Sequence, residues 1–432
     1  MSAPMTTAPR IPDDIARTVV DPKAHADPLR LDAAFAWLRA NMPLGVADIE
    51  GCDPFWVVTK HADILEVSRQ NALFTNGVRA TTFTTKELLA QVYKITGTPH
   101  LVKSLVQMDP PEHTDYRLLT QAWFMPQNLK RLEDRVRAIA REHADLMAAK
   151  APECDFVDEV AVWYPLRVVM EILGVPREDE PRMLKLTQEL FGATDEDLGR
   201  GGARDALASD EGVAVLQSVV MDFFQYFNAI TEDRRKNPRD DLASVIANGA
   251  INGQPLDPFN AMSYYVIVAT AGHDTTSSST AGGLWALLDN PDQLARLKAD
   301  PSLIPGFVDE SIRWTTPVRH FMRSPREDYV LRGQQLKAGD WMMLCYPSGN
   351  RDEDVFEAPD RFDITRSPNK HLAFGYGAHL CLGQHLAKLE MKMLWEEIIP
   401  RLSHIEHAGP ARLSAANFVN GPKKLPIRFT MS

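Results

Sequence analysis

The sequence is poor in cysteine. Four cysteines are spread over 432 residues, namely Cys52, Cys154, Cys345 and Cys381, and no two of them form a Cys-x-x-Cys pair. Disulfide frameworks belong to short secreted chains with closely spaced cysteines, so we expect reduced thiols and a cytoplasmic protein. Cys52, Cys154 and Cys345 are interpreted as small buried hydrophobic residues, which is the usual role of a free cysteine.

The sequence also lacks an excess of positive charge. It has 47 Lys and Arg against 58 Asp and Glu, which gives a formal net charge of −11. Sequence-independent binding of nucleic acid needs a strongly basic surface that displaces counterions, so no nucleic-acid partner is expected. Net charge does not exclude a local basic patch on one face of the protein.

Long hydrophobic runs are missing. No apolar stretch approaches the roughly 20 residues that span a bilayer. Residues 1–26 contain Arg10, Asp13, Asp14 and Arg17 and have no hydrophobic segment of the kind found in a signal peptide. We therefore expect a soluble protein that makes no membrane contact.

Linkers, low-complexity tracts and internal repeats are absent as well. Nothing marks a domain boundary, so we expect one domain over residues 1–432, although the length alone allows about three. Apolar residues recur at helical spacing over residues 132–147 and 382–398, where Pro400 ends the pattern. A third helix is predicted over residues 264–288.

Strand patterns are fewer and shorter. Residues 55–59 are aromatic and β-branched and follow Asp53-Pro54. Residues 329–344 alternate short apolar runs with turn residues and predict a small meander. The expected fold class is therefore mainly α with minor β.

The most informative segment is residues 374–383, which reads Phe-Gly-Tyr-Gly-Ala-His-Leu-Cys-Leu-Gly. Gly375 and Gly377 allow a tight loop whose backbone comes close to a flat ligand. Cys381 opens a strong helical pattern, and a helix N-terminus favours a thiolate because N–H donors and the helix dipole stabilise negative charge. Gly383 removes a side chain where a planar cofactor would clash. A thiolate among backbone donors is the anionic axial ligand that haem iron requires.

This segment resembles the haem-ligand loop of the cytochrome P450 family, F-G-x-G-x-H-x-C-x-G, at every fixed position. The resemblance implies that Cys381 is the proximal ligand of haem b, that Phe374, Gly375 and Gly383 lie against the cofactor, and that His379 contacts a propionate. It also implies a single-domain helical bundle around the haem with a small β-rich region. Residues 270–279 and 371–391 are most similar to soluble bacterial monoterpenol hydroxylases that act on terpineol.

A second motif lies upstream of the cysteine loop. Residues 271–276 read Ala-Gly-His-Asp-Thr-Thr and match the family's A-G-x-D/E-T-T pattern. A carboxylate beside a hydroxyl at a helix break can relay protons toward a buried site. The alternative is that the threonine hydroxyls bond back to their own helix, as is common for Ser and Thr. The resemblance implies that Asp274 and Thr275 are catalytic and that Ala271 lies over the haem.

Glu310 and Arg313 form an E-x-x-R motif. Alone, this spacing describes a surface ion pair worth a few tenths of a kcal/mol. In the family the pair is buried and is joined by an arginine from a later P-x-R-F motif, which residues 359–362 supply here through Arg361. The resemblance therefore implies a structural network of Glu310, Arg313 and Arg361 that supports the haem loop, because burying one charge alone is costly.

Haem propionates need cationic or hydrogen-bonding partners. Residues 109–113 read Asp-Pro-Pro-Glu-His and are followed by Arg117, which matches the family segment D-P-P-x-H-x-x-x-R. The resemblance implies that His113 and Arg117 contact the propionates and that Arg323 supplies a further contact. Each residue alone is weak support, and their order along the chain carries the prediction.

The resemblance also predicts a substrate pocket with small apolar walls, which suit a small apolar ligand such as a monoterpenoid or an alkyl-aromatic compound. For each wall residue, packing without ligand contact is the alternative. The predicted lining residues are Phe83, Tyr93, Ala271, Thr275, Val318, Phe321, Phe418 and Val419.

The implied reaction is monooxygenation, in which one atom of O₂ enters a C–H bond and the other leaves as water. Because no reductase module is present, two electrons are expected from a separate [2Fe–2S] ferredoxin and its NAD(P)H-dependent reductase, with the protein acting as a monomer. Lys130, Arg131 and Arg135 are candidates for docking an acidic ferredoxin, or they form a solvated helix face. Two rival functions are an H₂O₂-driven peroxygenase, which in the family lacks the acid–alcohol pair, and a non-catalytic haem sensor.

Overall fold

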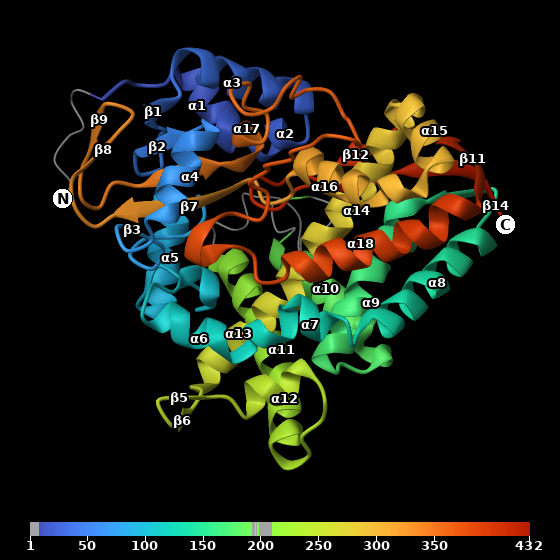
Figure 1. Cartoon of the computed structure of the whole chain (residues 1–432). Helices are drawn as coiled ribbons and strands as arrows, with labels where there is room; N and C mark the ends of the chain where they lie inside the picture. The colour runs from blue at the N-terminus through green and yellow to red at the C-terminus, as the bar shows by residue number, and fades with distance from the viewer. Residues whose placement is uncertain (1–7, 192–194, 196, 198–209) are drawn as a thin grey trace.

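Helices dominate the structure, a computed structural model that describes residues 8–191, 195, 197 and 210–432. About 55% of the chain is helical and about 13% is strand, within a single domain. The predicted fold class, mainly α with minor β, is therefore confirmed. In Figure 1 the N-terminal strands and helices lie at one end of the molecule, whereas the longer helices fill the other end together with the last strands of the chain.

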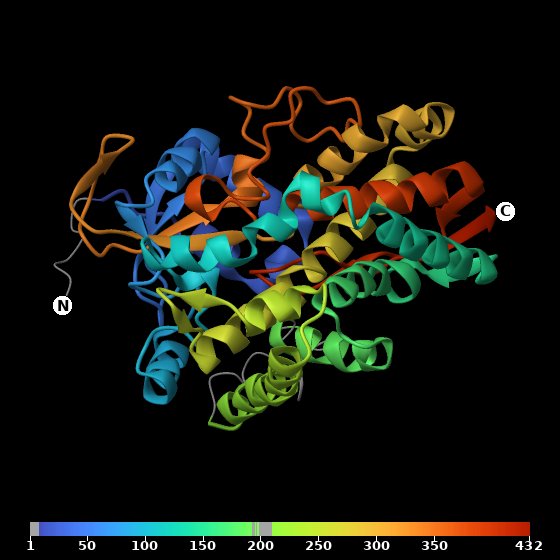
Figure 2. The same ribbon diagram turned by 60° about the horizontal axis from the view of Figure 1, so that its bottom comes forward.

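The helical part surrounds α14, which passes through its centre beside α16 and α18, while α18 also lies against α8 (Figures 1 and 2). Its helices are α8 (Glu133–Ala149), α9 (Trp163–Leu173), α10 (Glu180–Phe191), α11 (Asp210–Lys236), α12 (Leu242–Ala247), α13 (Pro258–Ala271), α14 (Asp274–Asp289), α15 (Pro291–Ala299), α16 (Ile304–Thr315) and α18 (Gln384–Ile398).

The N-terminal third contributes shorter helices, and one short helix from the C-terminal half packs with them. These are α1 (Asp13–Val20), α2 (Pro22–His25), α3 (Pro28–Asn41), α4 (His61–Arg69), α5 (Lys86–Thr96), α6 (Glu112–Gln121), α7 (Pro126–Leu129) and α17 (Tyr346–Gly349).

Local sequence signals explain where several helices begin. The Asp257 side chain accepts hydrogen bonds from the backbone N–H groups of Phe259 (2.9 Å) and Asn260 (3.2 Å), and Pro258 follows it as the first helical residue of α13. An acidic N-cap followed by proline satisfies free N–H groups and fixes the first helical dihedral angle.

Two of the three predicted helices are present with nearly the predicted bounds, as α8 and α18. The third is interrupted, because α13 ends at Ala271 and α14 begins at Asp274. Gly272 and His273 lie at the break, and the side chain of Thr275 donates a hydrogen bond to the carbonyl oxygen of Ala271 at 3.0 Å. The interruption places the predicted acid–alcohol motif at the start of a new helix.

The main sheet has the strand order β1-β2-β10-β7-β3. Its pairs are antiparallel except for β2 with β10, which is parallel. Two separate groups of buried apolar side chains pack on this sheet, whereas a larger group fills the helical part. The strands are β1 (Leu44–Ala47), β2 (Phe55–Val58), β3 (Phe74–Thr75), β7 (His320–Pro325) and β10 (Met342–Cys345).

The predicted meander over residues 329–344 is wrong in part. Strands β8 (Tyr329–Leu331) and β9 (Gln334–Leu336) form a separate hairpin, while β10 joins the main sheet between β2 and β7. The third strand of the pattern therefore pairs with strands that are distant in sequence, and local turn signals carry no information about such partners.

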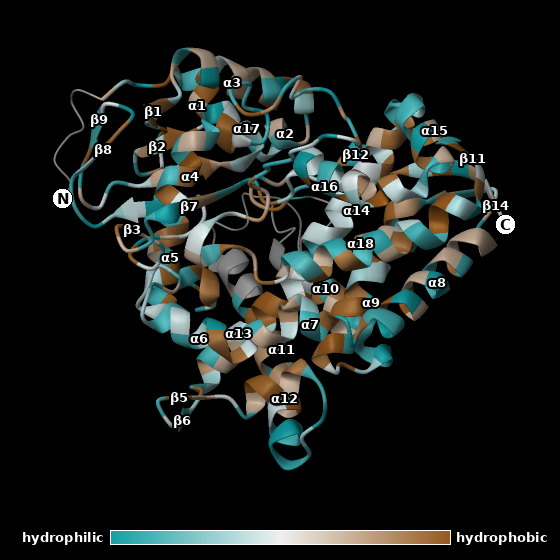
Figure 3. Ribbon diagram, in the orientation of Figure 1, coloured by the Kyte–Doolittle hydropathy of each residue, from teal (hydrophilic) through white to brown (hydrophobic). Residues whose placement is uncertain are grey.

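The remaining strands form small sheets. A three-stranded sheet contains β11 (Leu402–His407), β14 (Pro426–Met431) and β4 (Glu153–Asp155), and two hairpins pair β5 (Ala250–Ile251) with β6 (Gln254–Pro255) and β12 (Arg412–Leu413) with β13 (Pro422–Lys424). Figure 3 shows hydrophobic residues along much of α9 and α13. Within the described part of the chain, no helix is long and apolar enough to cross a membrane.

Candidate functional site

The cysteine loop lies between α17 and α18 and is closed by backbone hydrogen bonds. The N–H of Cys381 donates to the carbonyl oxygen of Phe374 at 2.9 Å, and the N–H of Gly375 donates to that of Leu372 at 2.8 Å. Gly377 has a φ of +74°, and a Cβ atom there would clash with the backbone of Ser68 at the end of α4. Gly377 therefore lets the loop approach α4, so its role differs from the predicted approach to a flat ligand.

Cys381 lies just before α18, and the backbone N–H groups of Gly383 and Gln384 are directed at its sulfur. Burial raises the pKa of the Cys381 thiol, whereas the Gly383 N–H, Arg117 and the Gln384 N–H lower it. The predicted donors are present, but in the protein alone the effect of burial exceeds theirs. A bound cation would reverse this balance, because a thiol that coordinates a metal ion loses its proton.

Two other cysteines differ in their surroundings. Burial raises the pKa of the Cys154 thiol to about 12, and carboxylates at Glu159 and Asp155 act in the same direction. Burial also raises the pKa of the Cys345 thiol well above its usual range. Both thiols are therefore inert at neutral pH, in agreement with their interpretation as packing residues.

Four residues predicted to hold propionates come together from three segments. The ring centroids of His113 and His379 are 4.2 Å apart. Burial, followed by the positive charges of Arg323 and Arg117 and by His113, lowers the pKa of His379 to about 2. The pKa of His113 is lowered to about 4 by burial and by Arg117, against a smaller effect of Asp109. The cluster therefore combines two cations with two neutral histidines.

The arrangement of this cluster fits the two carboxylates of a haem. Nε2 of His113 and Nε2 of His379 are buried and have no hydrogen-bond partner among the described residues. Arg117 donates to the carbonyl oxygen of Leu380 at 2.8 Å, and Arg323 donates to that of Met322 at 2.8 Å. Across the described residues, no ion pair of either arginine with a carboxylate is found, so two anionic groups would complete the cluster.

The space beside Gly383 points to the same cofactor. A Cβ atom built at Gly383 would meet no heavy atom within 4 Å, so this glycine borders open space next to the sulfur of Cys381. Ala271 is exposed and Thr275 is half-buried, although the junction of α13 and α14 lies near the centre of the molecule (Figure 1). These residues would hold a planar iron porphyrin between Cys381 and the helix break.

The helix break itself arranges a carboxylate beside hydroxyl groups. Asp274 is the first residue of α14, and its Oδ1 lies 2.9 Å from Nε2 of His273. Its Oδ2 is buried and has no hydrogen-bond partner in the described part of the chain. Because the Thr275 hydroxyl donates its proton to the Ala271 carbonyl oxygen, the lone pairs of its oxygen remain available to a donor. The back-bonding alternative is therefore realised and is compatible with a catalytic role.

The predicted structural network requires one correction. Glu310 and Arg313 are both fully buried and form a two-point ion pair with distances of 2.8 Å. The arginine side chain that joins them belongs to Arg366, whose Nε lies 3.2 Å from both carboxylate oxygens of Glu310. Arg361 has an exposed side chain and contributes only its carbonyl oxygen, which accepts from Arg313 at 3.3 Å. The geometry of the loop therefore brings the side chain of Arg366, and not that of Arg361, to the Glu310 carboxylate.

Four of the eight predicted pocket residues gather around β7 and the segment before β13. The rings of Phe321 and Phe418 are 5.5 Å apart, and Val318 pairs with Val419 in an isolated β-bridge. Phe83 packs on the same main sheet, where its ring centroid is 5.5 Å from that of Phe55 on β2.

Tyr93 does not join this group. It lies on α5 with 45% of its surface exposed, because only Val92 of that helix is buried. The pocket role of Tyr93 therefore stays a prediction, with no contact of its ring to the other predicted lining residues among the described contacts.

Sequence reasoning missed His320, which connects three of the pocket segments. The backbone N–H of Phe83 donates to Nε2 of His320 at 2.9 Å, and Nδ1 lies 3.0 Å from the carbonyl oxygen of Asn417. Burial lowers the pKa of His320 to about 4, so the ring is neutral. A lone histidine at the start of a strand gives no sequence signal for such a junction.

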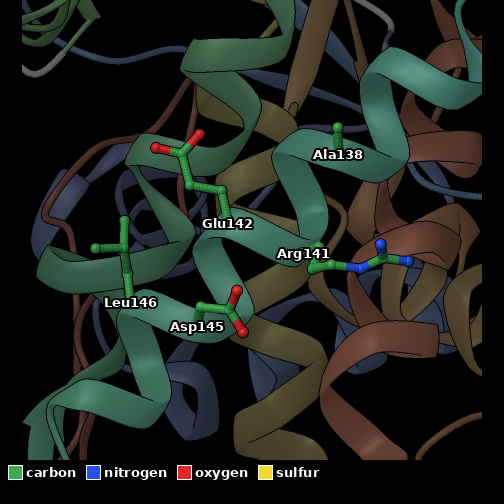
Figure 4. A pocket seen from close by; sticks show the side chains of 5 residues that line it. All are labelled: Ala138, Arg141, Glu142, Asp145 and Leu146. Atoms are coloured by element: carbon green, nitrogen blue, oxygen red, sulfur yellow. The ribbon is translucent and has the colours of Figure 1, made fainter.

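A surface hollow of about 440 Å³ lies elsewhere, along α8. Figure 4 shows its lining side chains extending from this single helix, and none of them is a predicted site residue. The hollow is therefore a depression between surface side chains, unrelated to the cysteine loop. Its lining residues are Ala138, Arg141, Glu142, Asp145 and Leu146.

Comparison with known proteins agrees with this geometry. The family model "Cytochrome P450" matches residues 70–429. Cytochrome P450-terp of Pseudomonas sp. is 50% identical over 421 residues, which cover 97% of this chain and 98% of that protein. A steroid C26-monooxygenase of Mycolicibacterium smegmatis is 34% identical over 409 residues, which cover 92% of each chain.

A crystal structure of a cytochrome P450 from Novosphingobium aromaticivorans superimposes with a TM-score of 0.91 at 44% identity, covering 98% of this chain and 100% of that chain. The sequence match and the fold thus extend over nearly the whole chain. The chain therefore belongs to the cytochrome P450 family, in which iron is held as a haem thiolate, and it is an oxidoreductase of the monooxygenase class.

Proposed function

We propose that this protein hydroxylates a small, mostly apolar terpenoid or alkyl-aromatic substrate, using O₂ and two electrons from a separate ferredoxin. The observation that carries the proposal is that two features occur on helices in contact with each other, α14 and α18. Cys381 with its backbone donors lies just before α18, and the helix break with Asp274 and Thr275 begins α14.

Haem b fits the residues around Cys381. Its iron would be held by the Cys381 sulfur, and its propionates would meet Arg117, Arg323 and the Nε2 atoms of His113 and His379. When bound, the haem supplies the activation of O₂, and the thiolate ligand favours O–O cleavage. The protein contributes binding, orientation and the exclusion of stray water.

Asp274 and Thr275 would hold and move protons at this site. The Thr275 oxygen is available to accept a hydrogen bond and would hold a proton there, because its own proton is engaged by the Ala271 carbonyl oxygen. Oδ2 of Asp274 is the carboxylate atom left to exchange a proton, since Oδ1 is held by His273. Their adjacency supports a role in general acid–base catalysis.

The substrate class is supported by the pocket walls and by the relatives. The side chains of Phe321, Phe418, Val318 and Val419 are apolar and lie together. Such walls select for shape and apolar surface. The identity of 50% to a protein named Cytochrome P450-terp, against 34% to a steroid monooxygenase, favours a small terpenoid over a steroid.

Of the three cations predicted to dock a ferredoxin, two are already engaged within the chain. Arg135 pairs with Glu171, and Arg131 lies 5.7 Å from the ring centroid of Trp123 and 3.9 Å from Asp240. These pairs are half-exposed and can rearrange on binding. We retain Lys130, Arg131 and Arg135 as the proposed site for a [2Fe–2S] ferredoxin that is reduced by an NAD(P)H-dependent enzyme.

We further propose that residues 1–432 act as one monomeric domain in the cytoplasm. The sparse cysteines and the inert thiols of Cys154 and Cys345 support a reducing compartment. The intact Asp274–Thr275 pair favours a monooxygenase over an H₂O₂-driven peroxygenase. It also argues against a non-catalytic haem sensor, because a sensor has no need of an acid–alcohol pair.

One experiment tests the proposal as a whole. The reduced holoprotein is titrated with CO, and small terpenoids and alkyl-benzenes are screened for a low-to-high-spin shift of the ferric form. Compounds that shift the spin state are then incubated with NADH, ferredoxin and reductase, or with H₂O₂ alone, and hydroxylated products are measured. We expect a thiolate-type Soret band and product only with the electron-transfer system. Product with H₂O₂ alone, or no ligand that shifts the spin state, would contradict the proposal.

A further inference from the structure

His273 occupies the one position of the A-G-x-D-T-T motif at which the family pattern is open. Its side chain is completely buried between α13 and α10. Nδ1 lies 3.0 Å from the carbonyl oxygen of Ala269, and Nε2 lies 2.9 Å from Oδ1 of Asp274 and 3.3 Å from Oγ1 of Thr187. Both ring nitrogens therefore have hydrogen-bond partners.

The identity of these partners determines where the ring protons lie. A carbonyl oxygen only accepts hydrogen bonds, so Nδ1 of His273 carries a proton. The Thr187 hydroxyl donates its proton to the carbonyl oxygen of Leu184 at 2.9 Å, and it can only accept from Nε2. Oδ1 of Asp274 is likewise an acceptor when the carboxylate is ionised. With acceptors at both nitrogens, the ring is an imidazolium.

His143 provides an internal comparison. It is also buried, and its Nδ1 also bonds to the carbonyl oxygen four residues earlier, that of Ile139 at 2.8 Å. Burial lowers the pKa of His143. Burial is the largest single effect on His273 and also lowers its pKa, but the Asp274 carboxylate and the Ala269 carbonyl oxygen together raise the pKa above its ordinary value. At His143 the neighbouring Glu142 acts against Arg177 and Arg167, whereas at His273 the Asp274 carboxylate lies 2.9 Å from Nε2.

We infer that His273 is a positioning residue, which holds the Asp274 carboxylate in a buried imidazolium–carboxylate pair and anchors that pair to α10 through Thr187. The pair fixes Oδ1 of Asp274 and leaves Oδ2 as the atom that exchanges a proton near Thr275. The effect of this pair on turnover rests on the proposed function. The charge of the His273 ring does not depend on that function. Removing His273 would leave the Asp274 carboxylate without its counter-charge, whereas removing the carboxylate would favour the neutral ring.

The charge of the ring is tested by NMR on the reduced, CO-bound holoprotein labelled with ¹⁵N-histidine. The His273 signals are assigned by their absence in His273→Gln. We expect both ring nitrogens to carry protons at pH 7.5, and we expect His273 to become neutral in Asp274→Asn, while His143 is neutral in both proteins. A neutral His273 in the unmodified protein, or an imidazolium that persists in Asp274→Asn, would overturn the inference.

The positioning role is tested by turnover in a double-mutant cycle. We expect His273→Phe to lower product formed per NADH and kcat about tenfold, with the substrate dissociation constant from the spin-state titration unchanged. His273→Gln, which restores an N–H donor to Asp274, should recover part of the coupling. The double variant His273→Phe with Asp274→Asn should be no worse than Asp274→Asn alone. His143→Phe is the matched control.

Additive losses in the cycle, or an unaltered His273→Phe enzyme, would show that His273 does not act through Asp274. If the unmodified protein formed no product at all, the proposed function would fail instead. The NMR experiment would still decide the charge of the pair in that case.

Discussion

At the scale of single residues, Glu310 organises the support beneath the cysteine loop. Its carboxylate is fully buried and accepts from Arg313, from Arg366, from Nδ2 of Asn369 at 3.0 Å and from the N–H of Asp363 at 3.0 Å. Two guanidinium groups thus share one carboxylate, and three of its donors come from the loop that leads to Cys381. The loop is held by charge-assisted hydrogen bonds in place of a regular helix or strand.

We predict that Arg366→Met destabilises the protein by about 3–5 kcal/mol, because a buried network loses one charged partner. Arg361→Met should change stability by less than about 0.5 kcal/mol, because the exposed side chain makes no contact with Glu310. Urea unfolding of both variants measures the difference. Equal destabilisation by the two substitutions would contradict the assignment of Arg366 to the network.

For Thr275, the loss of its hydroxyl should separate oxygen consumption from product formation. The hydroxyl oxygen is the acceptor that the helix break presents, since its proton bonds to the Ala271 carbonyl oxygen. We therefore predict that Thr275→Ala still consumes O₂ and NADH but forms several-fold less product per NADH. Ser279→Ala, which removes a hydroxyl bonded to the Thr275 carbonyl oxygen at 2.9 Å, serves as the control. Unchanged product per NADH in Thr275→Ala would refute the role.

His320 links stability to pH. Its folded-state pKa of about 4 lies below the unfolded value, so the unfolded chain binds a proton first as the pH falls. The neutral ring therefore contributes fully above about pH 6.5, and by pH 5 about 2 kcal/mol of stability is lost.

Substitution by glutamine isolates this effect. In His320→Gln, an amide replaces the titrating ring and can still join Phe83 to Asn417. We predict that the loss of stability between pH 7 and pH 5, measured by urea unfolding, is smaller by about 2 kcal/mol in this variant. The exposed His404→Gln serves as the control. An identical pH dependence in His320→Gln and the unmodified protein would exclude the proposed protonation.

At the scale of elements, the sequence predicted α8 and α18 well because their apolar periodicity is continuous and local. Over residues 264–288 the sequence predicted one helix, whereas the structure has α13 and α14. The apolar periodicity continues across Gly272 and His273, but the helical hydrogen bonds are interrupted there. The placement of β10 depended on pairing with Trp56 and Val57, nearly 300 residues away. Arg366 was missed for a similar reason, since loop geometry decides which arginine reaches Glu310.

The contact between α14 and α16 depends on two adjacent glycines of α14, Gly282 and Gly283, which pack against side chains of α16. A Cβ atom at Gly283 would lie 2.8 Å from Cβ of Ser311 and 3.3 Å from the ring of Phe307. We predict that Gly283→Ala destabilises the protein by about 1–3 kcal/mol, because the helices must separate. Gly409→Ala, where the nearest atoms are 3.6 Å away, should change stability by less than about 0.5 kcal/mol. Thermal unfolding of both variants tests this, and equal effects would contradict it.

At the scale of the whole molecule, the cofactor site joins the two ends of the fold. His113 and Arg117 come from α6, Arg323 comes from β7 of the main sheet, and Cys381 precedes α18 of the helical part. Without an anionic ligand, these segments bring buried cations together without compensation. Binding of a dianionic cofactor would therefore stabilise the packing of the sheet end against the helical end.

We predict that Arg323→Met affects the stability of the haem-free apoprotein and of the haem-bound holoprotein differently. Arg323 is 5% exposed and burial lowers its pKa, so its removal should leave the apoprotein equally stable or more stable. The holoprotein should lose about 1–3 kcal/mol of haem-dependent stabilisation, because a charged hydrogen bond to a propionate is lost. Thermal unfolding over a series of haem concentrations measures both effects. A lower Tm of the apoprotein variant would contradict the unpaired role of Arg323.

The contrast among the thiols has a practical consequence. Cys52 is 6% exposed, Cys345 is 1% exposed, and burial raises the pKa of the Cys154 thiol to about 12, so none of the three reacts readily with an alkylating reagent at neutral pH. Cys381 is partly buried in the protein alone, and its sulfur would be masked once it is bound to iron. Iron binding would therefore protect the Cys381 sulfur from a thiol-reactive dye, and the difference in label per chain between the haem-free and the haem-bound protein would report the fraction of a preparation that lacks its cofactor.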